Sequence, residues 1–398
     1  MKNEMYLLYR RVKGLGNSIL FILMRVFPIK RKKIVFTSIE GQSGYSCNPR
    51  YIAEEILNEG LTYDLYWLVN DISKPFPKQI KVVKNNIWNR AYHLTTADVW
   101  IDNSRKPLGT LKRKKQMYIQ TWHATLGFKP AGKLRQSFPK IAYLISTKDS
   151  RMADYVLTNS KWCDDLYEDM IFTVGNTLRE GSPRCDILVN KQQKDSQYKL
   201  IRKKYNIPSD YKIVMYAPTF RGGGQQNVRR VYEEEYSLGY AGLVDKLKEY
   251  WGGNWVVLLR LHPQLADSHK CVNKENLVID VSKEPDMNSI LAACDLMITD
   301  YSSAAFDACY AYIPVLLYAD DIKEYTKDRG KLLWELDELP FTISDSNEEL
   351  YKNIKDFDYE EYKEKIREML EKEEVFEDGN ASKRVVKIIS EHVDRRKG

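Results

Sequence analysis

Two of the five histidines directly follow apolar runs, a position that suits a side chain meeting a ligand. His123 ends the run in QTWHATLGFK, residues 120–129, and His262 ends the run in LLRLHPQ, residues 258–264. A neutral imidazole near its unperturbed pKa accepts the proton of an attacking hydroxyl, and an imidazole N–H donates to a phosphate oxygen. The alternative for each is a structural histidine bonded to the backbone. Residue type and position therefore favour proton transfer or anion binding.

Two arginines would suit a phosphate-bearing ligand. Arg221 stands before three glycines in YAPTFRGGG, residues 216–224, and Arg260 lies two positions before His262. Arginine recognises phosphate through paired N–H groups, and glycines let a backbone approach a ligand closely. The alternative for the first is a flexible surface loop with a solvated arginine. These residues point to phosphate chemistry beside the proton transfer.

Ser302 and Ser303 stand where a strand pattern changes to a helix pattern in LMITDYSSAAFDA, residues 296–308. Free N–H groups, the helix dipole and two hydroxyls would together form an anion site at such a helix start. The alternative is ordinary N-capping, which needs only one of the two serines. The pattern predicts a second place where phosphate is held.

Motifs for nucleotide loops and metal ions are missing from the sequence. It has no GxxxxGK[ST] loop and no GxGxxG after a strand, and its one DxD, at 356–358, lies in a charged tail. A phosphate-bearing substrate would then be held by Arg, Lys, His, Ser and helix termini. We therefore expect neither a metal ion nor a cofactor.

These residues need a scaffold that gathers strand ends, and the chain alternates strand and helix patterns from Lys33 onward. KIVFTSIEG, YDLYWLVND and QMYIQTW are typical of strands, and NPRYIAEEILNEG is typical of a helix with Asn48 as N-cap. Such alternation predicts a parallel sheet with helices on both faces. Ligands bind outside the carboxyl ends of the strands in sheets of this kind.

The chain is long enough for two such sheets. A polar, lysine-rich stretch at 190–210 separates two alternating patterns, and a charged helical tail begins near Asn347. We expect a basic segment at 1–32, an α/β domain at 33–190 and a second at 191–398 that includes the tail. The fold class would be two doubly wound, Rossmann-like domains facing a cleft lined by strand ends.

The amino-terminal segment mixes apolar and basic residues. Its apolar run, Ile19 to Met24, is too short to span a bilayer, and no cleavable signal pattern is present. We expect a helix lying on an anionic membrane face; the alternative is a solvated helix packed on the domain. The net charge of +7 fits an acidic partner, and six cysteines without a CxxC pair favour reduced thiols in a cytosolic protein.

Eight stretches carry a resemblance to a known family. They are GQSGYSCNPRYIAEEI, TADVWIDNSR, YIQTWHA, GSPRCD, YAPTFR, LRLHP, ACDLMITDYSSAAFD and EYTKDRG with the following LDELP, in this order between about Lys33 and Phe341. Together they resemble the CDP-glycerol glycerophosphotransferases, bacterial enzymes that build teichoic acids and related polyol-phosphate polymers of the cell wall. The resemblance implies a glycosyltransferase-B fold with CDP-glycerol as the donor substrate.

The resemblance also implies roles for individual residues and domains. It makes His123 the base. Donor-binding residues would be Arg221, His262, Asp300, Ser302 and Ser303, and contacts to phosphate or acceptor would come from Lys129, Arg184 and Arg260. The acceptor would be a lipid-linked saccharide or polyol phosphate, bound by domain 33–190, with the donor on domain 191–398. The enzyme would sit peripherally on the cytoplasmic face of the membrane, without a nucleic acid partner.

The loop after His123 departs from one branch of this family. Polymerase-like members carry an HGTPLK-type loop, whereas HATLGFK is one residue longer before Lys129 and is more similar to the HA-x-G-type loop of the primase-like branch. The function implied is transfer of glycerol phosphate from CDP-glycerol to a hydroxyl, with release of CMP. Alternatives are a CDP-ribitol or capsule polyol-phosphate transferase, a sugar-nucleotide glycosyltransferase, and a membrane-bound glycan- or nucleotide-binding protein without catalysis.

Overall fold

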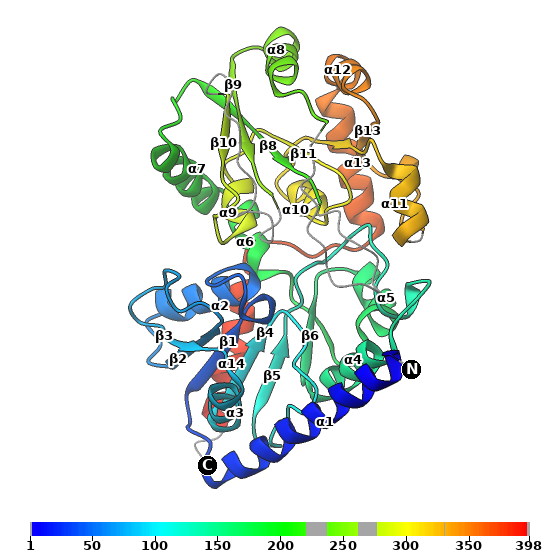
Figure 1. Cartoon of the computed structure of the whole chain (residues 1–398). Helices are drawn as coiled ribbons and strands as arrows, with labels where there is room; N and C mark the ends of the chain where they lie inside the picture. Colours follow the sequence, from blue (N-terminus) through cyan, green and yellow to red (C-terminus); the bar gives the residue numbers. More distant parts are fainter. Residues whose placement is uncertain (1, 220–236, 262–276, 330, 396–398) are drawn as a thin grey trace. The chain divides into compact units, whose positions relative to one another are not determined.

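The computed structural model describes residues 2–219, 237–261, 277–329 and 331–395 (Figure 1). The chain divides into two compact units, each built on one parallel sheet. The first unit comprises Met1–Thr125, Ala131–Asp186 and Phe376–Gly398; the second comprises Leu126–Pro130 and Ile187–Val375. The two α/β sheets expected from the alternating pattern are confirmed.

The first unit holds a seven-stranded sheet in the order β3-β2-β1-β4-β5-β6-β7, and all neighbouring strands are parallel. The strands are β1 Lys33–Thr37, β2 Asp64–Val69, β3 Lys81–Lys84, β4 Val99–Asp102, β5 Met117–Gln120, β6 Tyr155–Thr158 and β7 Thr177–Arg179. Strands β1, β4 and β5 are buried at every position, because helices cover both faces. The strand order reverses between β1 and β4, the point at which doubly wound sheets bind ligands.

Among its described residues, the first unit has six α-helices outside the short α6 Asp186–Val189: α1 Lys2–Leu23, α2 Cys47–Asn58, α3 Ile87–Thr96, α4 Lys140–Met152, α5 Lys161–Ile171 and α14 Ala381–Arg395. The last of these is distant in sequence, yet it runs along the first sheet (Figure 1). Its apolar face places Val385, Val386, Ile389 and Val393 in the same buried cluster as Trp67 of β2. The end of the chain therefore completes the core of its beginning.

The second unit holds a six-stranded parallel sheet in the order β10-β9-β8-β11-β12-β13. Its strands are β8 Tyr211–Ala217, β9 Asn254–Leu259, β10 Val278–Asp280, β11 Leu296–Thr299, β12 Val315–Tyr318 and β13 Thr342–Ser344. Its helices are α7 Lys191–Tyr205, α8 Tyr240–Trp251, α9 Met287–Leu291, α10 Ala304–Cys309, α11 Ile322–Arg329, α12 Asn347–Lys355 and α13 Tyr359–Lys372, and α6 Asp186–Val189 leads into the unit. Here the strand order reverses between β8 and β11.

The observed units differ from the expected ranges 33–190 and 191–398 at two places. Residues 376–398 belong to the first unit, because the apolar stripe of α14 is buried there and not against the second sheet. Residues 126–130 belong to the second unit, although the chain on both sides of them lies in the first. The polar stretch at 190–210, expected as a boundary, forms helix α7 of the second unit.

Helix α1 is seated on the first unit by polar contacts and close backbone approach. The Asn17 amide donates to the Leu108 carbonyl at 3.0 Å, and the Ser18 hydroxyl donates to the Gly109 carbonyl at 3.2 Å. A Cβ on Gly109, whose φ is +87°, would lie 1.9 Å from the carbonyl oxygen of Gly14, so a glycine is required there. Across the described part of the chain, no helix combines the length and the apolarity needed to cross a membrane.

Candidate active site

His123 lies just beyond the carboxyl end of β5, as expected from the apolar run before it. Its Nδ1 is 2.7 Å from the carbonyl oxygen of Asn103, which follows β4 directly. A carbonyl only accepts hydrogen bonds, so Nδ1 carries the proton and Nε2 keeps its lone pair. This is the tautomer that a general base needs. It is favoured because His123 and Asn103 follow two adjacent parallel strands, β5 and β4, which bring the imidazole to the carbonyl.

The surroundings of His123 favour the neutral imidazole. Crowding by protein atoms lowers the pKa of His123 most, and the charges of Arg184 and Arg105 lower it further. The Asn103 carbonyl and the Asp102 carboxylate act in the opposite direction without reversing the result. The side chain remains exposed, so a ligand can reach the ring. At neutral pH this histidine is uncharged and ready to accept a proton.

Asn48 connects three segments around His123. Its amide nitrogen donates to the carbonyls of Thr121 and Trp122, each at 3.1 Å. Its amide oxygen accepts from the Ser182 hydroxyl at 3.1 Å and from the Arg184 backbone N–H at 2.9 Å. The expectation that Asn48 is the N-cap of its helix is wrong: Ser46 occupies that position, and the Asn48 side chain reaches away from the helix. Asn48 therefore fixes the strand end that carries His123.

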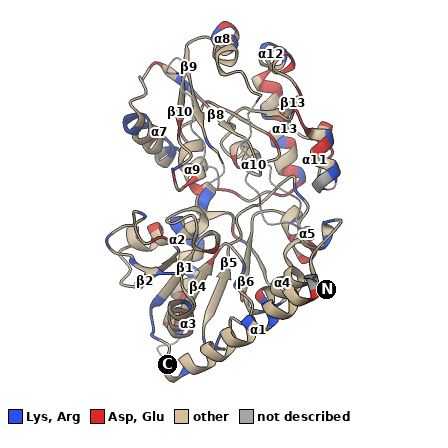
Figure 2. Ribbon diagram, viewed as in Figure 1, with Lys and Arg blue, Asp and Glu red and all other residues tan. Residues whose placement is uncertain are grey.

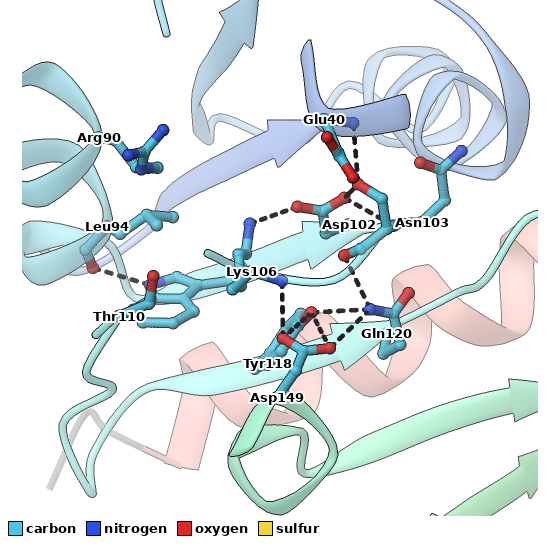
Figure 3. A network of polar contacts seen from close by, with 12 residues as sticks. Glu40, Arg90, Leu94, Asp102, Asn103, Lys106, Thr110, Tyr118, Gln120 and Asp149 are labelled. Atoms are coloured by element: carbon cyan, nitrogen blue, oxygen red, sulfur yellow. Dashed lines mark hydrogen bonds and ion pairs between the residues drawn. The ribbon is translucent and has the colours of Figure 1, made fainter. Parts of the chain in front are cut away.

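A buried polar network lies behind the same strand ends (Figure 3). The Lys106 ammonium pairs with the Asp102 carboxylate at 2.5 Å, with both side chains almost fully buried. Gln120 of β5 donates to the Tyr118 hydroxyl at 2.8 Å and to an Asp149 oxygen at 3.3 Å. The Gln120 oxygen accepts the backbone N–H of the next residue but one, at 3.0 Å. The network thus reaches the residue before His123.

That residue, Trp122, has a left-handed backbone with φ of +51°, which a bulky side chain rarely adopts. Its backbone N–H is held by Gln120 and its carbonyl by Asn48. The indole ring lies 4.5 Å from the His123 ring between centroids. Surrounding contacts therefore hold an unfavourable turn that presents the two rings side by side.

In the second unit, three of the expected donor residues, Asp300, Ser302 and Ser303, follow the end of β11. Ser302 and Ser303 precede helix α10, as predicted, and both side chains are partly exposed. The helix has only six residues, so its dipole contributes less than a long helix would. Asp300 is buried, and its carboxylate accepts the Thr219 backbone N–H at 3.0 Å and the Tyr301 N–H at 2.6 Å. Asp300 thereby joins the end of β8 to the end of β11.

The loop after His123 crosses into the second unit and packs against these serines. A Cβ on Gly127 would lie 3.5 Å from Cβ of Ser303. The Trp334 indole N–H donates to the Gly127 carbonyl at 3.1 Å, and the Leu333 N–H donates to the Phe128 carbonyl at 2.8 Å. Phe128 is fully buried, with its ring 4.9 Å from that of Phe306 on α10. Residues 126–130 are thus part of the serine site.

Lys129 and Arg260, two expected phosphate contacts, have different surroundings. Lys129 is exposed, and its ammonium lies 5.7 Å from the centre of the Tyr325 ring, which stacks on Tyr301. Arg260 is buried and donates to the Val281 carbonyl at 3.0 Å, so it holds the loop after β10. Lys129 therefore lies beside the stacked Tyr325 and Tyr301 rings, and the Arg260 side chain points into the protein interior.

Arg184, the third such contact, is almost fully buried in the turn Pro183–Cys185, and its charge acts on His123. Arg221 and His262 lie outside the described residues, so their expected roles stay predictions. Sequence reasoning did not identify Asn48, Trp334 or the Asn103 carbonyl as parts of the two sites. The stretches GYSCNPR and WIDNSR offered a signal, because they carry polar residues beside strand ends.

The sequence and the fold of this chain are similar to those of known proteins. The family described as CDP-Glycerol:Poly(glycerophosphate) glycerophosphotransferase matches residues 19–391. The teichoic acid poly(glycerol phosphate) polymerase of Staphylococcus epidermidis is 30% identical over 92% of this chain and 51% of its own length. That of Bacillus subtilis is also 30% identical, over 86% of this chain and 46% of its own.

A solved structure shares the whole fold. The wall teichoic acid polymerase TagF, a histidine-to-asparagine variant soaked with CDPG, superposes with a TM-score of 0.84 at 26% identity. The match covers 100% of this chain and 98% of that one. The chain spans about half the length of the two curated polymerases, so their whole activity does not transfer with the match. The fold is of the glycosyltransferase-B type, and the chain belongs to the CDP-glycerol:poly(glycerophosphate) glycerophosphotransferase family.

Proposed function

We propose that this chain is an enzyme that transfers glycerol phosphate from CDP-glycerol to a hydroxyl of a lipid-linked or polymeric acceptor, in the synthesis of teichoic acid or a related cell-surface polymer. The observation that carries the proposal is His123: exposed, neutral, and held with its Nε2 lone pair free of the Asn103 contact. Family membership supplies the donor class, because the family is named for CDP-glycerol.

In the proposed reaction, Nε2 of His123 takes the proton of the acceptor hydroxyl. The acceptor oxygen forms a bond to the β-phosphorus of CDP-glycerol while the bond from that phosphorus to the bridging oxygen breaks. CMP leaves with the bridging oxygen, and glycerol phosphate remains on the acceptor. General base catalysis of this kind contributes roughly 10²–10⁴-fold to a rate, and positioning with electrostatic stabilisation supplies the rest.

On the donor side, Ser302, Ser303 and Lys129 would bind the pyrophosphate. Ser302 and Ser303 are partly exposed before α10, and Lys129 follows Gly127, which lies against Ser303, and Phe128, which is buried beside α10. Arg221 and His262 would add two more donor contacts. Asp300 is proposed to act indirectly, because its carboxylate holds Thr219 at the start of the segment that carries Arg221.

Within the described residues, no three histidine, cysteine or carboxylate side chains gather as a metal-binding group. The expectation that the reaction needs neither a metal ion nor a cofactor stays a prediction. Activity should therefore survive treatment with a chelator such as EDTA. Loss of activity that added Mg²⁺ restores would contradict it.

We further propose that α1 holds the enzyme peripherally on the cytoplasmic face of an anionic membrane. Large apolar side chains remain exposed along it, among them Leu8 at 62%, Val12 at 61% and Leu15 at 63%. Figure 2 shows a mainly uncharged helix interrupted by basic positions. The basic residues of α1 include Arg11 and Lys13. Apolar burial plus attraction to anionic lipid would bind such a helix in the membrane interface.

Vesicle sedimentation tests the membrane proposal. The wild-type protein should sediment with vesicles that contain anionic phosphatidylglycerol, and Leu8→Asp with Val12→Asp should greatly reduce this. Ile72→Asp is the matched control, because Ile72 is equally exposed on the same unit at 59%. Equal loss in the control, or no loss in the double variant, would contradict a role of α1.

Product analysis tests the reaction. The wild-type enzyme, given CDP-glycerol and an acceptor ending in glycerol phosphate, should release CMP and extend the acceptor. His123→Ala should lower the rate by about 100-fold or more. His392→Asn is the control, since His392 contacts Asp98 at the amino end of β4, the opposite edge of the sheet.

The other outcomes separate the alternatives. CMP release from CDP-ribitol but not from CDP-glycerol would identify a ribitol phosphate transferase. A glycosyl transfer would release a nucleoside diphosphate in place of CMP. Full activity in His123→Ala would make His123 a structural residue and overturn the proposed base.

A further inference from the structure

Two arginines of the first unit flank His123, and the sequence motifs gave a role to only one of them. Arg105 follows β4 by three residues, and its guanidinium lies 5.2 Å from the Trp122 ring and 5.5 Å from the Phe172 ring. The Trp122 ring is in turn 4.5 Å from the His123 ring. A cation, an indole and an imidazole therefore follow one another at this edge of the sheet.

Arg184 approaches the same histidine from a different segment. Its backbone N–H and the Ser182 hydroxyl both donate to Asn48, which donates to the carbonyls just before His123. One amide side chain thus joins the Arg184 turn to the strand end that carries His123, the proposed base. The charges of both arginines act on the imidazole, although they reach it from residues 79 positions apart, 105 and 184.

The charges around His123 are predominantly positive. Asp102 is the carboxylate that acts on it, and Lys106 neutralises that carboxylate with an ion pair at 2.5 Å. Asp149 acts on Arg105 from the buried side, where its carboxylate also accepts the Lys106 backbone N–H at 3.0 Å and the Tyr118 hydroxyl at 3.2 Å. Burial lowers the pKa of Arg105 to about 10, so that arginine stays charged. Cations clustered beside an exposed histidine attract an anion.

We propose that Arg105 and Arg184 form a phosphate subsite beside His123, which takes the phosphodiester of an acceptor that ends in glycerol phosphate. This inference rests on the proposed function and narrows its acceptor. Guanidinium groups pair with phosphate oxygens through parallel N–H bonds. Both arginines belong to the unit of His123, whereas the proposed donor contacts belong to the other unit. A phosphate bound here sets the terminal hydroxyl of the acceptor at the imidazole.

An NMR titration of His123 tests the subsite without turnover. The probe is sn-glycerol 3-phosphate, with glycerol as the uncharged control, and the imidazole signal is assigned by its loss in His123→Asn. Glycerol 3-phosphate should raise the pKa of His123 in the wild-type enzyme, because a bound anion favours the imidazolium. The rise should disappear in Arg105→Gln and in Arg184→Gln, and should persist in Arg151→Gln, an exposed arginine of the same unit.

Kinetics give a second readout. With an acceptor ending in glycerol phosphate, Arg105→Gln should raise the acceptor KM by roughly ten-fold or more and change kcat less, because a charge-assisted bond is lost. With a lipid-linked disaccharide that lacks this phosphate, wild type and variant should differ little. Arg105→Lys keeps a cation over Trp122, so its acceptor KM should lie between those of wild type and Arg105→Gln. This variant controls for a folding defect caused by removing the charge.

The outcomes separate this inference from the function on which it rests. An unchanged His123 pKa with glycerol 3-phosphate, or an equal rise in all variants, overturns the subsite even if CMP is released. A rise that depends on both arginines supports the subsite even if no CMP appears, and then the proposed transferase reaction is what fails. Equal kinetic losses with both acceptors would show a structural role for Arg105 and overturn the proposal.

Discussion

At the scale of single residues, His123 owes its chemistry to contacts made by segments far from it in sequence. The Asn103 carbonyl sets its tautomer, and crowding by protein atoms, helped by the charges of two arginines, keeps it neutral. A base with a lowered pKa works at lower pH than free histidine does. The acidic limb of kcat/KM should therefore lie below the usual histidine pKa of 6.5.

Arg184→Gln should move this limb to higher pH. Removing a cation lets the imidazole bind its proton more readily, so activity is lost sooner as the pH falls. The measurement is a profile of kcat/KM from about pH 5 to 8 with CDP-glycerol in excess. Arg151→Gln should leave the limb in place. A limb that stays unchanged in Arg184→Gln would show that the base is a different group.

Lys33 gives a pH dependence of stability. Its ammonium is buried between the rings of Tyr66 and Tyr92 and donates to the Thr96 hydroxyl at 2.6 Å. Burial, then the charge of Lys30, lowers the pKa of Lys33 to about 7. Between this value and the unfolded value of 10.5, the unfolded chain binds more protons than the folded one. The free energy of unfolding therefore rises with pH across that window.

Lys33→Met removes this titration, so the difference between wild type and variant should change with pH. In urea unfolding at about pH 7, 8 and 9, the free energy of unfolding of wild type should increase relative to that of the variant, by at most about 1.4 kcal/mol per pH unit. Below pH 7 the folded protein bears the whole cost of burying the charged ammonium. The stability of Lys33→Met relative to wild type should therefore be greatest there. A difference that is constant over this range would show that Lys33 titrates normally.

At the scale of elements, sequence patterns found the strands, the strand-end position of His123 and the serines before α10. These features follow from the local spacing of apolar residues, which can be read directly from the sequence. Asn48 was misplaced because its partners, Thr121 and Arg184, are 73 and 136 residues away, respectively. An asparagine at a helix start satisfies the N-cap rule equally well, and only the fold decides between the two uses.

The sequence also carried no sign that residues 126–130 belong to the second unit. Nothing in HATLGFK marks a change of partner, because the contacts that hold it come from α10 and from Leu333 and Trp334, about 200 residues later. The loop HATLGFK, which is one residue longer before Lys129 than the HGTPLK-type loop, contributes its last residues to the second unit. Its glycine packs on Ser303, and its phenylalanine fills the core beside α10.

Trp334→Phe tests whether this seating supports donor binding. The change removes the indole bond to the Gly127 carbonyl and should cost about 1 kcal/mol of stability. Because Lys129 follows the seated residues, the KM for CDP-glycerol should rise several-fold. Trp251→Phe is matched: its indole donates to the Ile354 carbonyl at 2.8 Å in the same unit, so it should lose similar stability with an unchanged KM. Equal KM values in both variants would contradict the link.

At the scale of the whole molecule, the chain leaves the first unit at residue 186 and returns to it at 376. The return is anchored on the residue where the chain departed. Asp186 accepts the backbone N–H groups of Ala381 and Ser382 at 2.9 and 2.8 Å, which caps the start of α14. Glu377 accepts the Ser182 N–H at 3.0 Å, in the turn that carries Arg184. The last segment thus supports both the first core and the arginine turn.

Weakening α14 should therefore unfold the first unit selectively. Val386 is fully buried against the first sheet, and Val386→Ala should cost about 2 kcal/mol through lost burial and the cavity left behind. Differential scanning calorimetry should show the transition of the first unit moving to lower temperature while that of the second unit stays in place. Lys387→Ala, an exposed change on the same helix, is the control and should move neither transition. If both transitions moved together in Val386→Ala, the two units would unfold as one cooperative body, and the tail would stabilise the whole chain rather than the unit that it completes.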